Sequence, residues 1–440
     1  MLKIKRFIFI AVFMMSAGYA GAVNVNELNP EFFTRFNDDC LVYYINQAIE
    51  NNHNAKQATY QVEQYRQQAK YSLGKELPSF SVSADYLGIN TPKVDYFKLS
   101  KSAFVLPFQV NYEADFLLKN RDKTRSYKKA FEASRFEEKA VYISLLCDVA
   151  TVYTNILEYD ALISNQEKIT ENNKQILDYN NKKFARGVIS TNELNKFKQK
   201  YEDSENNLFQ YRKEREILAM QLAVLSGISA QNAGTLNTGE FINFEYNGQI
   251  PQTVSSDVIF ARPDVQSAEK QLEKAKIDVR VARKEFLPSF NITGIWAFNT
   301  IAPGSFFSWN SSLALLLAGA TQDIFTGGRK IANLKFQKAK YEELFEYYRQ
   351  TDLEAVKEVN TALCINKYDK DIEISTKSKL NYEAVNFNNN TKKFSRGVIS
   401  SPNLLQEQNN YLASENEYIK AKTQRLVNYF TLYKAVGGKL

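Results

Sequence analysis

The sequence predicts a membrane protein of the α+β class, in which pairs of membrane-spanning β-strands alternate with very long coiled-coil helices. Three observations predict it. The second half of the chain repeats the first at an offset of 210 residues, and each half holds two segments in which apolar and polar residues alternate. Heptad-patterned helical segments also run for many turns without Pro or Gly. Four strands are too few to close a barrel, so several chains must share one.

The first 22 residues (1–22) predict a secretory signal peptide. Three cations precede an apolar stretch over residues 7–15, and small residues end the segment at Ala22. No cysteine lies near this end, so we expect no acylated N-terminal cysteine. Cleavage would remove three positive charges, and the formal net charge would fall from +7 to +4. Such a small charge predicts no nucleic-acid partner.

The composition argues against an enzyme. A single histidine and three cysteines among 440 residues leave little from which to build a metal site or a Cys/His relay. No hydrolase, zinc-protease or nucleotide-binding motif is present, so we predict no catalytic residue, no metal and no cofactor. We interpret Cys40, Cys147 and Cys364 as free buried thiols, with a disulfide bridge as the alternative.

The duplication sets the predicted organisation of the mature chain. Residues 180–227 match residues 390–437 without a gap at 17 of 48 positions, where chance would give roughly three. The same offset pairs the Leu-Pro-Ser-Phe segments at 77–80 and 287–290. We therefore predict a first repeat over 23–230, a linker over 231–257 and a second repeat over 258–440. Each repeat should consist of a helix, a β-hairpin, a long helix, a tip turn and a returning helix, with the hairpins at about 78–115 and 288–325 and the tip turns at 186–191 and 396–401.

The strand segments alternate in a way typical of lipid-facing barrel strands, with apolar side chains outside and polar ones inside. A soluble β-domain with one buried face fits the same alternation and stays the alternative. In the first repeat the alternation covers 79–87 and 104–113, and no helix-length apolar run of about 18 residues follows the signal peptide. The predicted lipid-facing residues of the second repeat are Phe290, Ile292, Trp296 and Phe298, followed by Trp309, Leu313, Leu315 and Leu317.

The helices are predicted from steps of three and four between apolar residues. From residue 123 to residue 183 the chain has no Pro or Gly, so a single helix there would be roughly 90 Å long. The helix after the first tip keeps the rhythm from Leu194 to Leu225. In the last helix, Leu405, Leu412, Ile419 and Leu426 recur every seven residues, as in a coiled-coil seam.

Both tip turns read Arg-Gly-Val-Ile-Ser. Gly187 is placed to end a helix with positive φ, and Ser190 with Glu193 predicts a capping box at the start of the next. In the second copy we expect Ser401 as the N-cap and Pro402 at the first helical position. Branched apolar residues flanked by arginine at a hairpin tip predict a docking surface, while packing within the turn is the alternative. The predicted docking residues are Arg186, Gly187, Val188, Ile189, Ser190, Arg396, Gly397, Val398, Ile399 and Ser400.

These features resemble the TolC family of outer-membrane efflux and secretion channels. The resemblance rests on the duplication, the two tips, the Ala-Arg-Pro-Asp-Val segment at 261–265, the two Leu-Pro-Ser-Phe segments and Phe-Thr-Gly-Gly-Arg at 325–329. It implies a homotrimer with a 12-stranded barrel in outer-membrane lipid and a long α-helical barrel in the periplasm. It also implies coupling to an inner-membrane transporter through a periplasmic adaptor (membrane fusion) protein. The implied function is a passive exit duct of an efflux pump or type I secretion system, carrying small toxic compounds or polypeptides.

The resemblance further implies that the tips form a periplasmic gate and receive the adaptor. Family members often carry acidic residues just after the second tip, where this chain has the neutral Asn403 and Gln406. The equivalent positions in the first copy are Glu193 and Lys196, so we expect no strong acidic ring at the constriction.

Two further expectations follow from the same comparison of the copies and the family pattern. Thr326 stands where the family commonly has aspartate, so a capping role there is lost or passes to threonine. His53 should be a helix-start residue and not a ligand. The competing interpretation of the whole chain is a periplasmic coiled-coil adaptor or scaffold, although an adaptor would carry one hairpin and not two complete copies.

Overall fold

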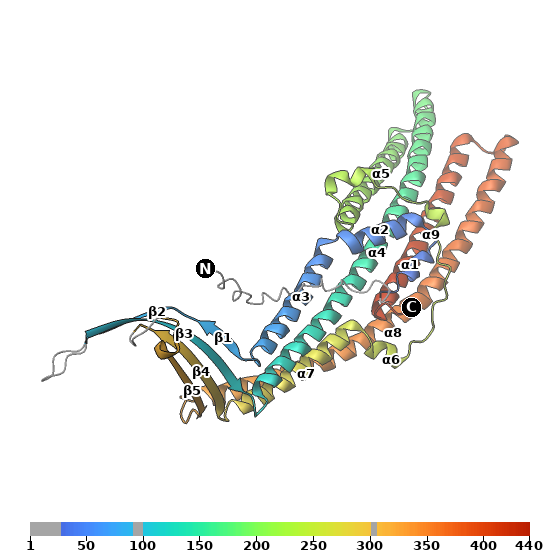
Figure 1. Ribbon diagram of the computed structural model, residues 1–440. Coiled ribbons are helices and arrows are strands. Elements are labelled where there is room, and N and C mark those ends of the chain that lie inside the picture. Colours follow the sequence, from blue (N-terminus) through green and yellow to red (C-terminus); the bar gives the residue numbers. More distant parts are fainter. Residues whose placement is uncertain (1–27, 91–99, 301–305) are drawn as a thin grey trace.

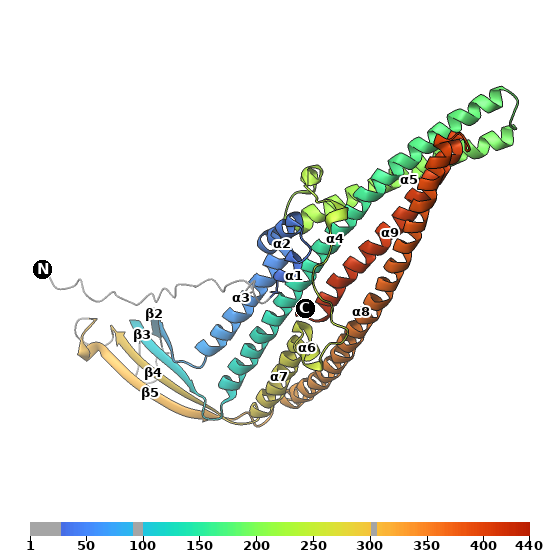
Figure 2. The same ribbon diagram turned by 90° about the vertical axis from the view of Figure 1, so that its right-hand side faces the viewer.

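The computed structural model describes residues 28–440 apart from 91–99 and 301–305, so the predicted signal peptide at 1–22 lies outside the described residues. The molecule is elongated, with a small curved sheet at one end and two helical hairpin tips at the other (Figures 1 and 2). One polypeptide thus joins a small β-sheet to helices that run along most of the length of the molecule.

The described residues of the first half form, in order, three helices, three strands, a long helix and a returning helix. Its long helix, α4, has 67 residues and is therefore about 100 Å long, in agreement with the predicted uninterrupted helix. The elements are α1 (Glu31–Thr34), α2 (Asp39–Asn51), α3 (His53–Gly74), β1 (Ser79–Val82), β2 (Asp85–Asn90), β3 (Ser100–Ala114), α4 (Lys119–Ala185) and α5 (Thr191–Leu225).

The second half has the same order of main elements, and its helices have equal lengths. Helix α8 has 67 residues like α4, and α9 has 35 like α5. After the linker helices η2 (Ala230–Thr235) and η3 (Phe241–Asn243), the elements are α6 (Ser256–Phe260), α7 (Pro263–Lys284), β4 (Ser289–Asn299), η4 (Trp309–Ser311), β5 (Ser312–Thr321), α8 (Arg329–Ser395) and α9 (Ser401–Ala435).

Each long helix is accompanied by two shorter ones placed end to end. Helix α3 packs along α4 near the sheet and α5 packs along it toward the tip, while α7 and α9 do the same for α8 (Figure 2). The junctions are fastened alike in both halves: Asn52 Nδ2 donates to the Leu225 carbonyl at 2.9 Å, and Arg262 Nη1 donates to the Ala435 carbonyl at 2.8 Å. These bonds satisfy carbonyls that a helix end otherwise leaves unpaired. His53 is the first residue of α3, as expected.

The sheet is antiparallel with the order β1-β3-β4-β5, and β2 lies on the same edge of β3 as β1. The prediction of one strand over 79–87 is therefore wrong, because the strand breaks at residues 83–84. Opposite the break, the Pro107 carbonyl accepts from the Ser83 N–H at 3.2 Å. In an antiparallel ladder a residue's N–H and C=O point to the same neighbour, and Pro107 has no N–H to return to Ser83.

The register also corrects the predicted lipid-facing side of the last strand. Phe290, Ile292, Trp296 and Phe298 share one face of β4, as predicted, but their partners on β5 are Ala320, Ala318, Ala314 and Ser312. Leu313, Leu315 and Leu317 lie on the opposite face, since they pair with Ala297, Ile295 and Thr293. Trp309 belongs to η4 and not to the strand. A shift of one residue in register moves every side chain of a strand to the other face of the sheet. Alternation within one strand therefore does not reveal which of its two sides lies on the same face as a given side of the next strand.

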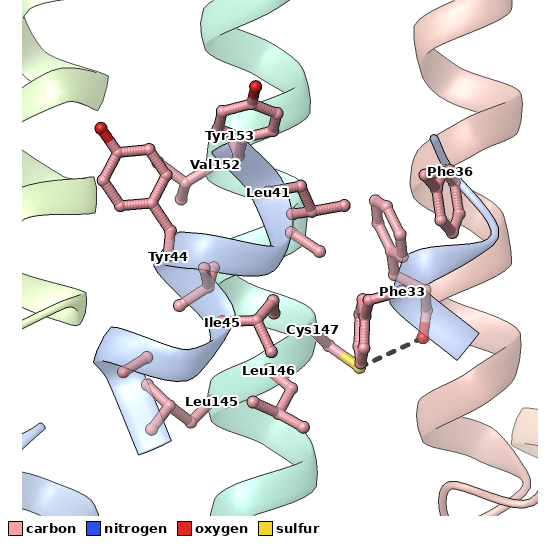
Figure 3. Packing of buried hydrophobic residues seen from close by; sticks show 14 of the residues in the cluster. Phe33, Phe36, Leu41, Tyr44, Ile45, Leu145, Leu146, Cys147, Val152 and Tyr153 are labelled. Atoms are coloured by element: carbon pink, nitrogen blue, oxygen red, sulfur yellow. Dashed lines mark hydrogen bonds between the residues drawn. The ribbon is translucent and has the colours of Figure 1, made fainter. Parts of the chain in front are cut away.

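The main core lies where α2, α4 and the end of α9 meet the N-terminal helix α1 (Figure 3). Aromatic rings of α1 stack on those of α9, for example Phe32 on Tyr433 with centroids 4.7 Å apart. Cys147 is buried there and its Sγ donates to the Phe430 carbonyl at 3.3 Å. The three cysteines are free, but only Cys147 is buried as predicted, whereas Cys40 is half-buried and Cys364 exposed.

Among the described helices, α4 alone has an 18-residue window apolar enough to cross a membrane. Of that window, 67% is buried inside the protein. The window coincides with the main core, so its apolar character is explained by packing against α2 and α9.

Candidate functional site

The two hairpin tips have the same backbone geometry. Gly187 and Gly397 both adopt φ of +71°, as predicted. In the first tip the Gly187 N–H donates to the Phe184 carbonyl at 2.9 Å and the Val188 N–H to the Lys183 carbonyl at 3.0 Å. The second tip repeats both bonds at 2.8 and 2.9 Å. This is the Schellman arrangement, which satisfies the last carbonyls of α4 and α8 and turns the chain sharply.

The turn places apolar side chains in solvent. Val188 is 65% exposed and Val398 69% exposed, and Phe184 and Phe394 are also exposed on the last turns of α4 and α8. Ile189 and Ile399 are half-buried, so each tip covers one branched side chain and leaves the other open. Arg186 and Arg396 occupy the C-cap positions and are exposed. Both tips lie at the end of the molecule opposite the sheet (Figure 1).

The helix starts after the two tips differ. The capping box is confirmed for α5: the Ser190 Oγ accepts from the Glu193 N–H at 3.2 Å, and the Glu193 carboxylate accepts from the Ser190 N–H at 2.9 Å. The expected N-cap of α9 is wrong, because Ser400 and not Ser401 occupies that position and no side chain caps it. Pro402 follows Ser401 as the second helical residue, where its missing N–H needs no partner within the helix.

The four constriction candidates lie in the first two turns of α5 and α9, two on each helix. The Glu193 carboxylate serves the capping box, and these hydrogen bonds from Ser190 lower its pKa. Lys196 and Asn403 are exposed. Gln406 contacts the other hairpin, since its Oε1 accepts from Lys200 Nζ at 3.3 Å. Gln406 is thus the one candidate of the four that a hydrogen bond between the two hairpins holds in place.

A seam of amide side chains joins the two hairpins below the tips. Asn165 donates to Asn416 at 3.0 Å. Two helical turns closer to the tip, Asn172 donates to Asn409 at 2.8 Å. Asn409 in turn donates to Asn173 at 3.0 Å. Buried amide groups need hydrogen-bond partners, and most of these amides hydrogen-bond to one another. A groove of about 460 Å³ opens between α4, α5 and α9 along this seam.

At the other end, a cavity of about 960 Å³ lies between the sheet and the helix ends. One face of the sheet contributes polar residues to its wall, including Asn111, Glu113, Asn291 and Thr293. Thr293 donates to Asn111 Oδ1 at 3.1 Å, so polar side chains of neighbouring strands are linked on this face. The opposite face carries Phe108, Trp296 and Phe298, whose rings contact one another with centroids 5.0 to 6.3 Å apart.

A buried carboxylate fastens the two halves together just outside the sheet. Asp122 of α4 contacts Lys284 at 2.6 Å, Arg280 at 2.9 Å and Arg125 at 3.3 Å, and its side chain is 2% exposed. Burial alone would raise the pKa of Asp122, but the hydrogen bond from Lys284 and the charges of Arg280 and Lys284 outweigh it, and the pKa lies below its ordinary value. The helix start also differs between the halves. Asp115 accepts from the Arg121 N–H of α4 at 2.8 Å. Helix α8 begins at Arg329 with Gly328 as its N-cap and no side-chain cap, so Thr326 does not take over a capping role.

Sequence reasoning missed the amide seam, the Asp122 cluster and the face of the sheet on which the β5 leucines lie. The seam had a weak signal, because Asn416 repeats Asn206 and breaks an apolar heptad. Asp122 stood among ordinary helix charges, which usually mark a solvated face. Among the described residues, no group of three or more His, Cys, Asp or Glu side chains is placed to hold a metal ion.

A sheet with one aromatic and one polar face, set on helices about 100 Å long, is typical of a membrane protein with a large part outside the bilayer. The profile of the outer membrane efflux protein family matches residues 44–228 and again residues 254–438. The chain belongs to this family, which confirms the resemblance drawn from the sequence and places it among the outer-membrane components of efflux pumps.

Two curated relatives and one solved structure show the range of the family. The cation efflux system protein CusC of Escherichia coli K12 is 24% identical over 95% of this chain and 91% of its own. The solvent efflux pump outer membrane protein SrpC of Pseudomonas putida is 23% identical over 92% of this chain and 86% of its own. The crystal structure of the Campylobacter jejuni CmeC outer membrane channel has the same fold, with a TM-score of 0.85 and 22% identity over 93% of this chain and 88% of that one.

Proposed function

We propose that the protein is a passive, non-catalytic exit duct formed by three copies of the chain, each contributing four strand positions to a 12-stranded barrel. Two tandem repeats, 23–230 and 258–440, joined by the linker 231–257, supply the strands and the helices of the periplasmic tube. The observation that carries this proposal is the open sheet: β1 and β2 leave one edge of the described sheet unpaired and β5 leaves the other. In lipid, unpaired backbone groups cost several kcal/mol each, so strands of neighbouring copies must complete the ladder.

The surface of α8 supports an assembly of copies. Only four described residues of this 67-residue helix are buried within the chain. Large apolar side chains along it are exposed instead, more than a monomer in water would leave open. They include Ile331, Phe336, Phe345, Leu353, Ile372 and Val385.

The tips are the proposed docking surface for a periplasmic adaptor that connects the duct to an inner-membrane transporter. Their exposed valines and arginines offer an apolar contact with a positive rim, which fits a partner with apolar and acidic side chains. The same tips, with Glu193, Lys196, Asn403 and Gln406 behind them, form the proposed periplasmic constriction. Three of these four groups are neutral or positive, so the constriction should not attract cations strongly.

The test is a double charge reversal, Arg186→Glu with Arg396→Glu, in cells that depend on this protein for export. We expect export of the accumulated compound to be lost while folded oligomers remain in the outer membrane. The matched control is Lys168→Glu with Lys370→Glu, which changes two exposed cations of α4 and α8 away from the tips. Unchanged export in the tip variant, or equal loss in the control, would contradict a docking role of the tips.

A further inference from the structure

The leucines of β5 form an apolar stripe on the polar face of the sheet. Leu313, Leu315 and Leu317 alternate along the strand and are each about half exposed. The register extends the stripe onto β4, where Ile295 and Ala297 are the partners of Leu315 and Leu313. From Leu313 to Leu317 the stripe is about 14 Å long.

The register decides which environment this stripe meets. Leu317 pairs with Thr293, and Thr293 lines the 960 Å³ cavity together with Asn111. The stripe therefore continues the wall of that cavity. The lipid-compatible face, with Trp296 and Phe298, is the other one, and on β5 it carries Leu316.

Neither lipid nor a neighbouring copy of the chain covers this stripe. Lipid would contact the aromatic face, because side chains of opposite parity point to opposite sides of a sheet. A neighbouring strand that pairs with the free edge of β5 does so in the plane of the sheet, through backbone hydrogen bonds, and leaves both faces uncovered. The stripe thus faces the water of the duct, where an apolar surface attracts apolar solutes.

We infer that the Leu313–Leu315–Leu317 stripe is a transient contact site for apolar and amphiphilic organic cargo inside the strand section of the duct. This inference rests on the proposed function as an exit duct and names the cargo class. A hydrated metal cation gains nothing from leucine side chains, and the stripe itself contains no carboxylate, thiol, thioether or imidazole that would bind one. Between the cargoes that the names of CusC and SrpC suggest, the stripe favours organic molecules.

The test uses the full-length protein in planar bilayers, with cargo surrogates added from the side of the sheet. Tetraphenylphosphonium is an apolar cation, and tetramethylammonium carries the same charge without the apolar surface. We expect tetraphenylphosphonium to interrupt the ionic current for measurable times and tetramethylammonium not to do so. The combined variant Leu313→Asn, Leu315→Asn and Leu317→Asn should shorten these interruptions by about tenfold or more, and Leu315→Asn alone by a smaller factor, because apolar contact area is lost.

Leu316→Asn is the matched control, since it changes a leucine of the same strand on the opposite face. It should lower the amount of inserted protein and leave the interruption time of inserted channels unchanged. If the combined variant or, should that variant not insert, Leu315→Asn conducts with unaltered interruptions, the stripe is not a cargo site although the duct stands. If the wild-type protein forms no conducting oligomer, the duct itself fails and this inference with it.

Discussion

At the scale of single residues, Asp122 shows how one buried charge connects the two halves of the chain. It lies on α4, while Lys284 and Arg280 lie on α7 of the second half. Lys284 also donates to the Leu118 carbonyl at 3.1 Å, so the same side chain links α7 to the residue before α4. A carboxylate with 2% exposed surface is stable only because three cations and their hydrogen bonds replace its water.

We predict that Asp122→Asn lowers the free energy of unfolding by about 2 kcal/mol or more, because three neighbouring cations lose their common anion. Thermal unfolding of the detergent-purified protein measures this. Glu343→Gln is the control, since the Glu343 pair with Lys340 is exposed on α8 and should contribute less than about 1 kcal/mol. Equal melting temperatures of the wild type and Asp122→Asn would contradict the prediction.

The same residue predicts a dependence on pH. The pKa of Asp122 is lowered in the folded protein, so its contribution is complete above the pKa of about 3.9 that an aspartate has in an unfolded chain. It is lost as the pH falls through the lowered pKa of the folded state. The difference in melting temperature between wild type and Asp122→Asn should therefore shrink on acidification below about pH 4.

At the scale of elements, the helices could be predicted and the sheet register could not. Helix α4 follows from the absence of Pro and Gly over 60 residues and from its apolar period, which are local properties of the sequence. The tips followed from Gly187 and Ser190 for the same reason. The face of the sheet that Leu313 occupies depends on the connection between β4 and β5, which includes η4. The length of this connection sets the register, and the alternation within either strand carries no information about it.

We predict that Pro107 alone causes the break between β1 and β2. Pro107→Val would supply the missing N–H opposite Ser83 and should protect the amides of residues 79–90 from hydrogen exchange, with a gain of about 1 kcal/mol in ladder stability. Pro288→Val, which lies before β4 and outside the ladder, is the control. Exchange as fast as in the wild type would show that the break has another origin, such as the hydrogen bond that the Ser83 hydroxyl donates to Asp85.

At the scale of the whole molecule, the sheet end and the tip end both expose surfaces that further copies or partners would cover. The sheet has two free edges, α8 exposes apolar side chains along its length, and the tips present valines to solvent. The sequence alone predicted the need for several chains from the strand count. The number three came from the family resemblance, because no residue pattern within one chain encodes how many copies close a ring.

The most direct test of the account is the mass of the protein extracted with detergent from isolated outer membranes, corrected for bound detergent. We predict a particle with the mass of three chains, found in that membrane fraction. A soluble periplasmic monomer or dimer would contradict the shared barrel, and with it the proposed duct.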